Sequence, residues 1–208
     1  MLGLLGKKLG QTRVYDAQGN VVPVTMVLAG PNHVLQCKTV KADGYEAVQL
    51  GFDPQKDHRL TKPMQGHLKK QKGPPLRRIR EFRNFAKKVK PGDVLGADLF
   101  VPGDFVDAIG ITKGRGFSGV MRRFNFSGGT GSHGNKGWKR RPGAVGQGTF
   151  PGTIRKGMPM PGQMGQVRRT VQSLEVMQVH SEDNLLLIKG SIPGAKGDYV
   201  VIRQSKKI

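Results

Sequence analysis

The sequence predicts a mainly β protein, a small antiparallel barrel or sandwich that carries a long, largely irregular basic extension. Short β-rich runs follow one another at hairpin spacing, which is typical of these architectures. No stretch of useful length repeats its apolar residues every 3.6 positions, so long amphipathic helices are not expected. Residues 113–169 combine 15 Gly and 12 Lys or Arg with no Asp or Glu, a composition unlike the rest of the chain.

The first half of the chain contains two candidate hairpins. Residues 12–15 and 21–28 flank the turn sequence Asp-Ala-Gln-Gly-Asn, in which Gly and Asn tolerate a positive φ. Residues 34–40 and 45–50 are separated by the turn sequence Lys-Ala-Asp-Gly. These runs predict four strands in the N-terminal part of a globular β-barrel domain.

The remaining strands of this domain lie on either side of the glycine-rich segment. They are expected at residues 105–112, 171–180, 184–189 and 199–203, each bounded by Gly, Pro, Asn or Asp. The globular domain is therefore expected over residues 1–112 and 170–208, with residues 113–169 forming the extension.

Residues 54–90 are expected to form a basic insertion within the globular domain. Prolines at four positions prevent a long helix here, so only a short helix near residues 66–70 is expected. The run Leu-Arg-Arg-Ile-Arg-Glu-Phe at residues 76–82 is expected to be a strand that returns to the barrel.

The net charge of +21 comes from 35 Lys and Arg against 14 Asp and Glu, and it is concentrated in two blocks. Residues 54–90 carry 13 cations and 2 acids, and residues 108–174 carry 12 cations and no acid. The other parts of the chain are close to neutral or acidic. Segregated charge of this size indicates two contact surfaces for a polyanion.

Several classes of protein are not expected from the composition. The single cysteine, Cys37, rules out a disulfide framework and a cysteine-based zinc site, and it fits a reducing cytosol. The five histidines are scattered, so no metal site is expected. No apolar run is long enough to cross a bilayer, and neither a signal peptide nor a membrane partner is expected.

The extension is expected to order only on a partner. A segment rich in Gly and Lys or Arg cannot bury enough apolar area to offset the entropy of ordering its backbone. RNA is favoured over DNA because the sequence contains no recognition helix for the major groove, whereas an acid-free filament suits the irregular surface of folded RNA.

The candidate RNA-binding residues are mainly cations that can neutralise phosphates. They are Lys69, Lys70 and Lys72 in the first block, and Lys113, Arg115, Arg122, Arg123, His133, Lys136, Trp138, Lys139, Arg140, Arg141, Gln147, Arg155, Lys156, Arg168 and Arg169 in the second. The lone Trp138 is expected to stack on a base or insert between RNA helices, with packing against the barrel as the alternative. Phe117, Phe124 and Phe126 are expected to pack at the base of the extension.

Two patterns in the extension could indicate catalysis or a nucleotide. Residues 114–119 match G-x-G-x-x-G, but a dinucleotide site also needs a βαβ unit and an acidic residue about 20 positions further on. No acid lies between Asp107 and Glu175, and the same absence leaves His133 beside Ser132 without an orienting carboxylate. No catalytic residue is therefore expected, and an RNA-modifying enzyme or nucleotide-binding factor using this loop is kept as the alternative.

The run FVPGDFVDAIGITKGRGFSGVMRR at residues 100–123 resembles the signature of the universal uL-three family of large-subunit ribosomal proteins. Further similarity lies in SHGN at 132–135, in GQMG at 162–165 and at both ends of the chain, so the resemblance covers essentially the whole sequence.

The resemblance implies a translation-protein-type β-barrel without a cofactor, located in the cytoplasm as part of the ribosome. It implies a structural constituent of the large subunit that binds 23S rRNA near its 3′ end, nucleates assembly and extends toward the peptidyl-transferase centre. It also implies neighbouring ribosomal proteins fourteen and nineteen of the large subunit. Some bacterial relatives carry a methylated glutamine where this chain has Thr149, so that modification is not expected here.

Overall fold

The computed structural model describes residues 1–71 and 73–207, which form two compact units. The globular unit comprises Met1–Thr112 together with the chain from Arg168 onward. The glycine-rich unit is Lys113–Val167. The expected fold class is confirmed, because the structure is mainly β and its largest sheet closes into an antiparallel barrel rather than a sandwich.

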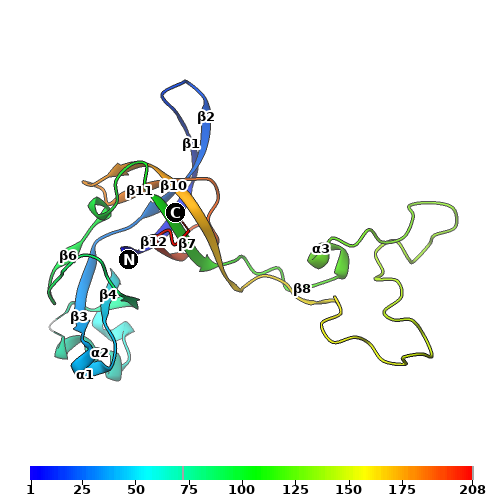
Figure 1. Cartoon of the computed structure of the whole chain (residues 1–208), viewed down its shortest axis with the longest axis horizontal. Coiled ribbons are helices and arrows are strands. Elements are labelled where there is room, and N and C mark those ends of the chain that lie inside the picture. The colour runs from blue at the N-terminus through cyan, green and yellow to red at the C-terminus, as the bar shows by residue number, and fades with distance from the viewer. Residues whose placement is uncertain (72, 208) are drawn as a thin grey trace. The chain divides into compact units, whose positions relative to one another are not determined.

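Six strands of the globular unit close the barrel, in which every pair of neighbours is antiparallel (Figure 1). In spatial order they are β1 (Gly3–Tyr15), β12 (Tyr199–Gln204), β7 (Phe105–Ile111), β10 (Arg168–His180), β11 (Leu185–Lys189) and β2 (Val21–Leu28). The expected strands at 105–112, 171–180, 184–189 and 199–203 are thus all members of the barrel.

The two longest strands allow the sheet to close. The first half of β1 pairs with β12 and its second half pairs with β2, with a register shift between Lys8 and Gly10. Strand β10 divides its length in the same way between β7 and β11, with a shift between Val176 and Gln178. Such bulges bend a strand and increase its twist, which lets one strand belong to both sides of a closed barrel.

A second sheet of four strands packs against the barrel within the globular unit. Its spatial order is β5 (Leu76–Arg83), β4 (Ala47–Pro54), β3 (Asn32–Lys38) and β6 (Val94–Leu95). The expectation that residues 76–82 return to the barrel is wrong, because β5 pairs with β4 at the edge of this second sheet. A strand alternates between inward-facing and outward-facing residues in either sheet. The sequence alone therefore does not show whether residues 76–82 pair with a barrel strand or with β4.

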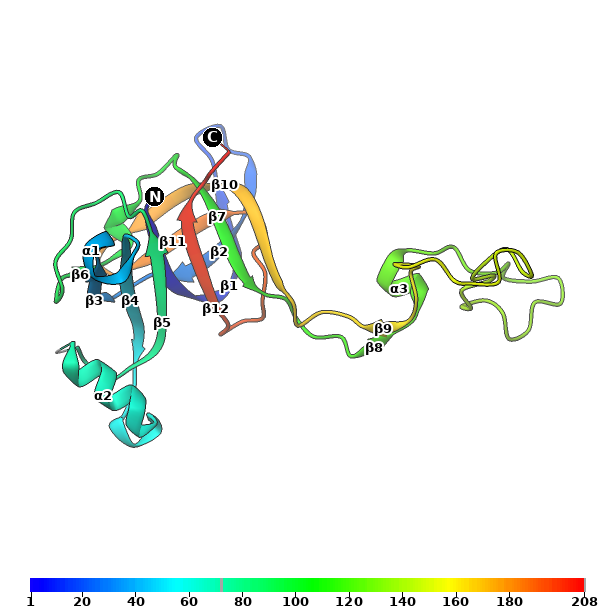
Figure 2. The ribbon, with the colours of Figure 1, turned by 60° about the horizontal axis from the view of Figure 1, so that its bottom comes forward.

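Short helices connect these strands, and η denotes a 3-10 helix. They are α1 (Val40–Asp43), η1 (Asp57–Arg59), α2 (Lys62–Lys70) and η2 (Ala97–Leu99). The helix expected at 66–70 is the second half of α2, which begins earlier because Pro63 occupies the first turn, where no backbone N–H is needed. Figure 2 shows α2 beside the ends of β4 and β5, and its buried Leu68 packs with Leu35 and Leu76.

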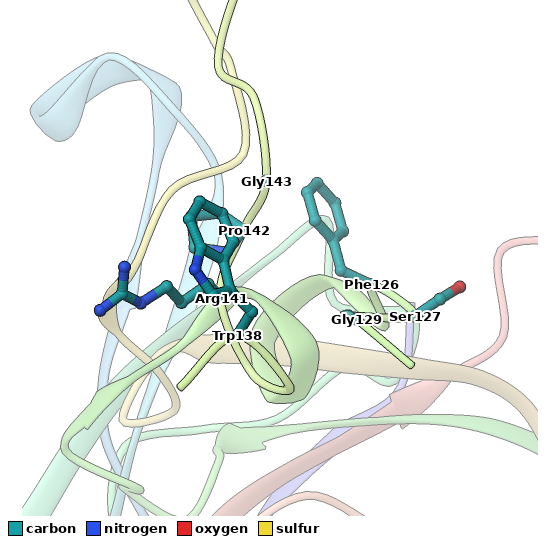
Figure 3. A pocket seen from close by; sticks show the side chains of 8 residues that line it. Phe126, Ser127, Gly129, Trp138, Arg141, Pro142 and Gly143 are labelled. Carbon is teal, nitrogen blue, oxygen red and sulfur yellow. The ribbon is translucent and has the colours of Figure 1, made fainter. Parts of the chain in front are cut away.

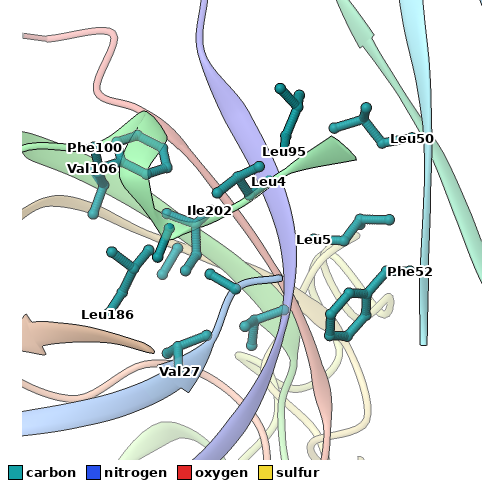
Figure 4. Close-up of a cluster of buried hydrophobic side chains, with 14 of the residues drawn as sticks. Leu4, Leu5, Val27, Leu50, Phe52, Leu95, Phe100, Val106, Leu186 and Ile202 are labelled. Carbon is teal, nitrogen blue, oxygen red and sulfur yellow. The ribbon is translucent and has the colours of Figure 1, made fainter. Parts of the chain in front are cut away.

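One continuous hydrophobic core joins the barrel to the second sheet. Successive residues of a strand point to opposite faces, so Leu4 lies among the barrel residues while Leu5 faces the other way (Figure 4). Leu5 lies beside Leu50 and Phe52 of the second sheet, and all four side chains are buried. The two sheets therefore form one domain with β1 as their shared wall.

Asn32 is the buried polar residue that links these layers. Its side-chain oxygen accepts the backbone N–H of Leu5 at 3.0 Å. Its side-chain nitrogen donates to the carbonyl oxygens of Leu5 at 3.0 Å and Ala29 at 2.9 Å. The start of β3 is thereby fixed to β1 through three hydrogen bonds in the protein interior.

The glycine-rich unit contains little regular structure. Strand β8 (Phe117–Ser118) pairs with β9 (Gly162–Gln163), and the only other element in this unit is α3 (Val120–Phe124). The described residues include no helix that is long and apolar enough to cross a membrane. They also include no group of three or more His, Cys, Asp or Glu side chains that could hold a metal ion.

We predict that Asn32→Ala lowers the free energy of unfolding by about 2–3 kcal/mol, because buried backbone groups of Leu5 and Ala29 lose their partners. The measurement is urea unfolding of the full chain followed by circular dichroism. Gln18→Ala in the exposed turn between β1 and β2 is the control and should change stability by less than about 0.5 kcal/mol. Equal unfolding midpoints for Asn32→Ala and the native chain would contradict this role.

Candidate RNA interface

The glycine-rich unit starts and ends on two neighbouring strands. Ile111 at the end of β7 is paired in register with Arg168 at the start of β10. Beyond them the two chain segments continue side by side, since Arg115 N–H donates to the Met164 carbonyl at 2.9 Å and Met164 N–H donates to the Gly116 carbonyl at 2.9 Å. The chain therefore leaves and re-enters the barrel as an antiparallel ribbon that includes β8 and β9.

This ribbon differs from a dinucleotide-binding loop. A G-x-G-x-x-G fingerprint joins a parallel strand to a long helix whose N-terminus receives the pyrophosphate. Here residues 115–118 pair with an antiparallel segment, and the helix that follows has only five residues. The geometry favours close backbone approach to a partner over a nucleotide pocket.

All ten cations of the glycine-rich unit are exposed. They are Lys113, Arg115, Arg122, Arg123, Lys136, Lys139, Arg140, Arg141, Arg155 and Lys156. The unit contains no Asp or Glu, so none of these charges is compensated by a carboxylate of the same unit. A polyanion is the partner that relieves this repulsion most directly.

One of these cations also has an internal role. The Arg123 guanidinium donates to the Met160 carbonyl at 2.7 Å and lies 5.0 Å from the centre of the Phe124 ring. It thereby ties α3 to the segment that returns to the barrel. Its exposed edge remains available to a phosphate.

Four of the five aromatic side chains of the unit are exposed, and the fifth, Phe126, is half-buried. Phe150 is 88% exposed, Phe117 is 79% exposed and Trp138 is 56% exposed. The expectation that Phe117 and Phe124 pack at the base of the extension is wrong, because neither is covered there. Phe124 lies 6.4 Å from Phe126, ring centre to ring centre, and this is its one ring partner among the described residues. Exposed rings among cations are typical of surfaces on which bases stack.

Trp138 has a cation and a pocket beside it. The Arg141 guanidinium lies 5.0 Å from the centre of the indole ring. Trp138 and Arg141 line a pocket together with Phe126 and Pro142 (Figure 3).

The other expected RNA-binding residues are exposed in turns, a helix and a strand. His133 has a φ of 58° in the turn that contains Asn135, and Gln147 precedes Gly148 in an exposed loop. Lys69 and Lys70 are exposed in the last turn of α2, while Lys72 lies outside the described residues.

The boundary of the glycine-rich unit differs from the expected extension. Arg168 and Arg169 lie in β10, paired with Ile111 and Gly110, so they belong to the globular unit although both are exposed.

A second group of cations in the globular unit was not singled out from the sequence. Three cations surround the Tyr199 ring: Arg78 at 4.6 Å, Arg77 at 5.8 Å and Lys7 at 6.0 Å from its centre. Within the described part of the chain none of the three forms an ion pair with a carboxylate. They come from β5 and β1, which belong to different sheets, so only the packing of the two sheets brings them together.

Tyr199 is also hydrogen-bonded to a carboxylate. The Tyr199 hydroxyl donates a hydrogen bond to the Asp53 carboxylate. Burial is the main cause that raises the pKa of Tyr199, and this hydrogen bond is the second. The hydroxyl therefore remains a donor at neutral pH. The cluster of Lys7, Arg77, Arg78 and Tyr199, hereafter the Tyr199 cluster, thus presents positive charge to the solvent. The sequence signal for it is the density of arginine in the run Leu-Arg-Arg-Ile-Arg-Glu-Phe-Arg.

A closed β-barrel that carries one group of cations, joined to a second unit whose cations are free of acids, is typical of a structural nucleic-acid-binding protein. The family model described as Ribosomal protein L3 matches residues 70–184. The large ribosomal subunit protein uL3 of Deinococcus radiodurans is 49% identical over 207 residues, which cover 100% of this chain and 96% of that protein. The chain belongs to the ribosomal protein L3 family.

Membership of this family establishes the general role of the protein. It is a structural constituent of the large ribosomal subunit, it binds rRNA, and its partners are rRNA and other ribosomal proteins. It acts in translation as part of the ribosome in the cytoplasm. The family is structural and is not known for an enzymatic activity.

We predict that replacing Lys139, Arg140 and Arg141 together with alanine weakens rRNA binding and flattens its salt dependence. Removing one phosphate contact reduces the slope of log K against log salt by about 0.7–0.9, so the slope of the triple variant should fall by about 2. The measurement is a salt titration of binding to 23S rRNA by filter retention. An unchanged slope would remove these three residues from the interface.

Proposed function

We propose that this chain is a primary rRNA-binding protein that binds near the 3′ end of 23S rRNA and nucleates assembly of the large subunit. In this proposal the globular unit docks on the rRNA, and the glycine-rich unit passes between RNA helices toward the peptidyl-transferase centre. The observation that carries it is the run of ten exposed cations without one acid in Lys113–Val167. The resemblance of residues 100–123 to the family signature supports the position on the rRNA that we propose.

Ordering of the glycine-rich unit on rRNA supports a role in assembly. This unit has one two-residue strand pair and one five-residue helix, and the described buried core clusters contain none of its residues. Phosphates that neutralise its cations would supply the stabilisation that apolar burial does not. A protein segment that orders between RNA helices reduces the repulsion between their backbones, which favours the compact RNA fold.

The globular unit contributes the second surface. Lys69 and Lys70 on α2 and the Tyr199 cluster are the cations that we propose to contact phosphates there. Arginine is well suited to this role because its planar guanidinium can donate two parallel hydrogen bonds to a phosphate. The neighbouring proteins that we propose are ribosomal proteins fourteen and nineteen of the large subunit, on the basis of the family.

We predict that removing the glycine-rich unit weakens binding to rRNA while leaving the barrel folded. Residues 113–166 are replaced by Asn-Gly, which closes a two-residue hairpin between neighbouring strands β7 and β10. The native chain should prefer a 3′-terminal fragment of 23S rRNA over an unrelated structured RNA. The replacement should reduce both the affinity for that fragment and the salt slope, by about 0.7–0.9 for each phosphate that the unit would otherwise neutralise.

The thermal unfolding midpoint of the globular unit is the control for this replacement and should stay within a few degrees of the native value. The additional change Arg77→Ala with Arg78→Ala in the replaced chain should remove much of the binding that remains. If both RNAs bind equally well and the replacement changes neither affinity nor slope, the proposal is wrong.

A further inference from the structure

The glycine-rich unit contains a pocket of about 310 Å³ next to Trp138. Its walls are Phe126, Trp138, Arg141 and Pro142, and its floor is the backbone around Gly128 and Gly129. In Figure 3 the Phe126 ring and the Trp138 indole stand apart across the pocket, and the Arg141 guanidinium lies beside the indole on the side away from Phe126. The volume is at the lower end of the range of small-molecule sites, about 300–1,000 Å³.

Two glycines allow the floor of the pocket to form. Gly128 has a φ of +74°, and a Cβ there would collide with the Lys139 carbonyl and lie 3.0 Å from the Met121 sulfur. Gly129 donates its N–H to the Lys139 carbonyl at 3.2 Å, and a Cβ there would lie 2.8 Å from the Asn135 side-chain nitrogen. The backbone at 128–129 thus lies directly against Lys139, which closes the pocket between Phe126 and Trp138.

The walls of the pocket suit a flat aromatic ligand. Two aromatic rings face the space, and the stacking of Arg141 on the other side of the indole limits the orientations that Trp138 can adopt. The pocket has no carboxylate to pair with a cationic ligand, and its two polar side chains, Ser127 and Arg141, are both exposed. Stacking is therefore the main interaction that this pocket offers.

The charges around the pocket indicate how such a ligand is attached. Lys139 and Arg140 directly follow Trp138 and are exposed. A base that enters the pocket has a phosphate on each side of its nucleotide, and these cations lie next in the chain to receive them. A polynucleotide therefore matches both the rings and the charges, whereas a free aromatic molecule matches the rings alone.

We propose that this pocket binds one unstacked nucleobase of rRNA, held between Phe126 and Trp138, with its flanking phosphates on Lys139 and Arg140. The proposal rests on the proposed function, because it names the group that the glycine-rich unit recognises when it enters the RNA. It adds a point of base recognition to the phosphate contacts, which by themselves carry no sequence information.

The test uses large subunits assembled with the full chain, together with binding of the chain to 23S rRNA. Ultraviolet crosslinking followed by mass spectrometry should join the peptide that contains Trp138 or Phe126 to one nucleotide. Dimethyl sulfate and 2′-hydroxyl acylation then report the exposure of that nucleotide. We expect Trp138→Leu to remove the crosslink, to change the reactivity of the same nucleotide and to weaken binding about tenfold, as loss of one stacking partner does.

Two further variants separate stacking from a general disturbance of the unit. Trp138→Phe should restore most of the binding and the reactivity pattern, because the flat ring is retained. Ile154→Ala changes an exposed apolar residue of the same unit outside the pocket and should leave the crosslinked nucleotide unchanged. The salt slope of Trp138→Leu should equal that of the native chain, since no cation is removed.

The experiments distinguish failure of the base-pocket proposal from failure of the proposed rRNA-binding function. If Trp138→Leu leaves the crosslink and every nucleotide reactivity unchanged, while replacement of residues 113–166 still lowers the salt slope, the base pocket is refuted and the phosphate-binding role stands. If that replacement also leaves the slope and affinity unchanged, both proposals are refuted. A crosslink from Trp138 to a neighbouring protein instead of to a nucleotide would likewise overturn the base pocket.

Discussion

Uncompensated positive charge is the constraint on which the organisation of this protein depends. The glycine-rich unit carries ten cations and no acid, whereas the globular unit pairs several of its acids with its own cations. Like charges held close together in one segment oppose compaction of that segment. The molecule is accordingly divided into a unit that folds around a core and a unit that, in our proposal, is stabilised by rRNA.

A buried carboxylate links the barrel strands to which the glycine-rich unit is joined. Asp107 in β7 is almost completely buried, and its carboxylate accepts two hydrogen bonds from Arg203 in β12, at 3.2 and 2.9 Å. The same carboxylate accepts the backbone N–H of Ser173 in β10 at 3.2 Å. One buried carboxylate thus links three neighbouring strands of the barrel, including the two between which the glycine-rich unit is inserted. Such a charge stays buried only because each of its oxygens has a partner.

Much of this architecture could be predicted from the sequence, because hairpins are local. The turn between β1 and β2 and the strands β10, β11 and β12 follow from β-rich runs bounded by Gly, Asn and Asp. The first part of β1 was missed because Gly3 and the pair Lys7-Lys8 interrupt the pattern of a strand. Gly3 lets the Phe82 ring of the second sheet approach the backbone, and the Lys8 amine donates to the carbonyls of Ile192 and Gly194. Both reasons lie in residues that are distant in the sequence.

In the candidate interface, too, local composition could be predicted from the sequence, whereas contacts between distant residues could not. Composition alone identifies the cations of the glycine-rich unit, because no acid is interspersed among them. The Tyr199 cluster was missed because Lys7, Arg77 and Tyr199 meet only when β1, β5 and β12 come together from two sheets. The pocket beside Trp138 depends on the contact between Gly128 and Lys139, which the spacing of glycines does not reveal.

Hydrogen–deuterium exchange of the backbone amides, compared between the free chain and the assembled large subunit, tests the central claim most directly. The claim is that Lys113–Val167 is ordered by rRNA. In the free chain its amides should exchange rapidly, and in the subunit they should be strongly protected, whereas the amides of β7 and β10 should be protected in both states. Equal protection of Lys113–Val167 in both states would contradict this account, because the unit would then be stable without its polyanion.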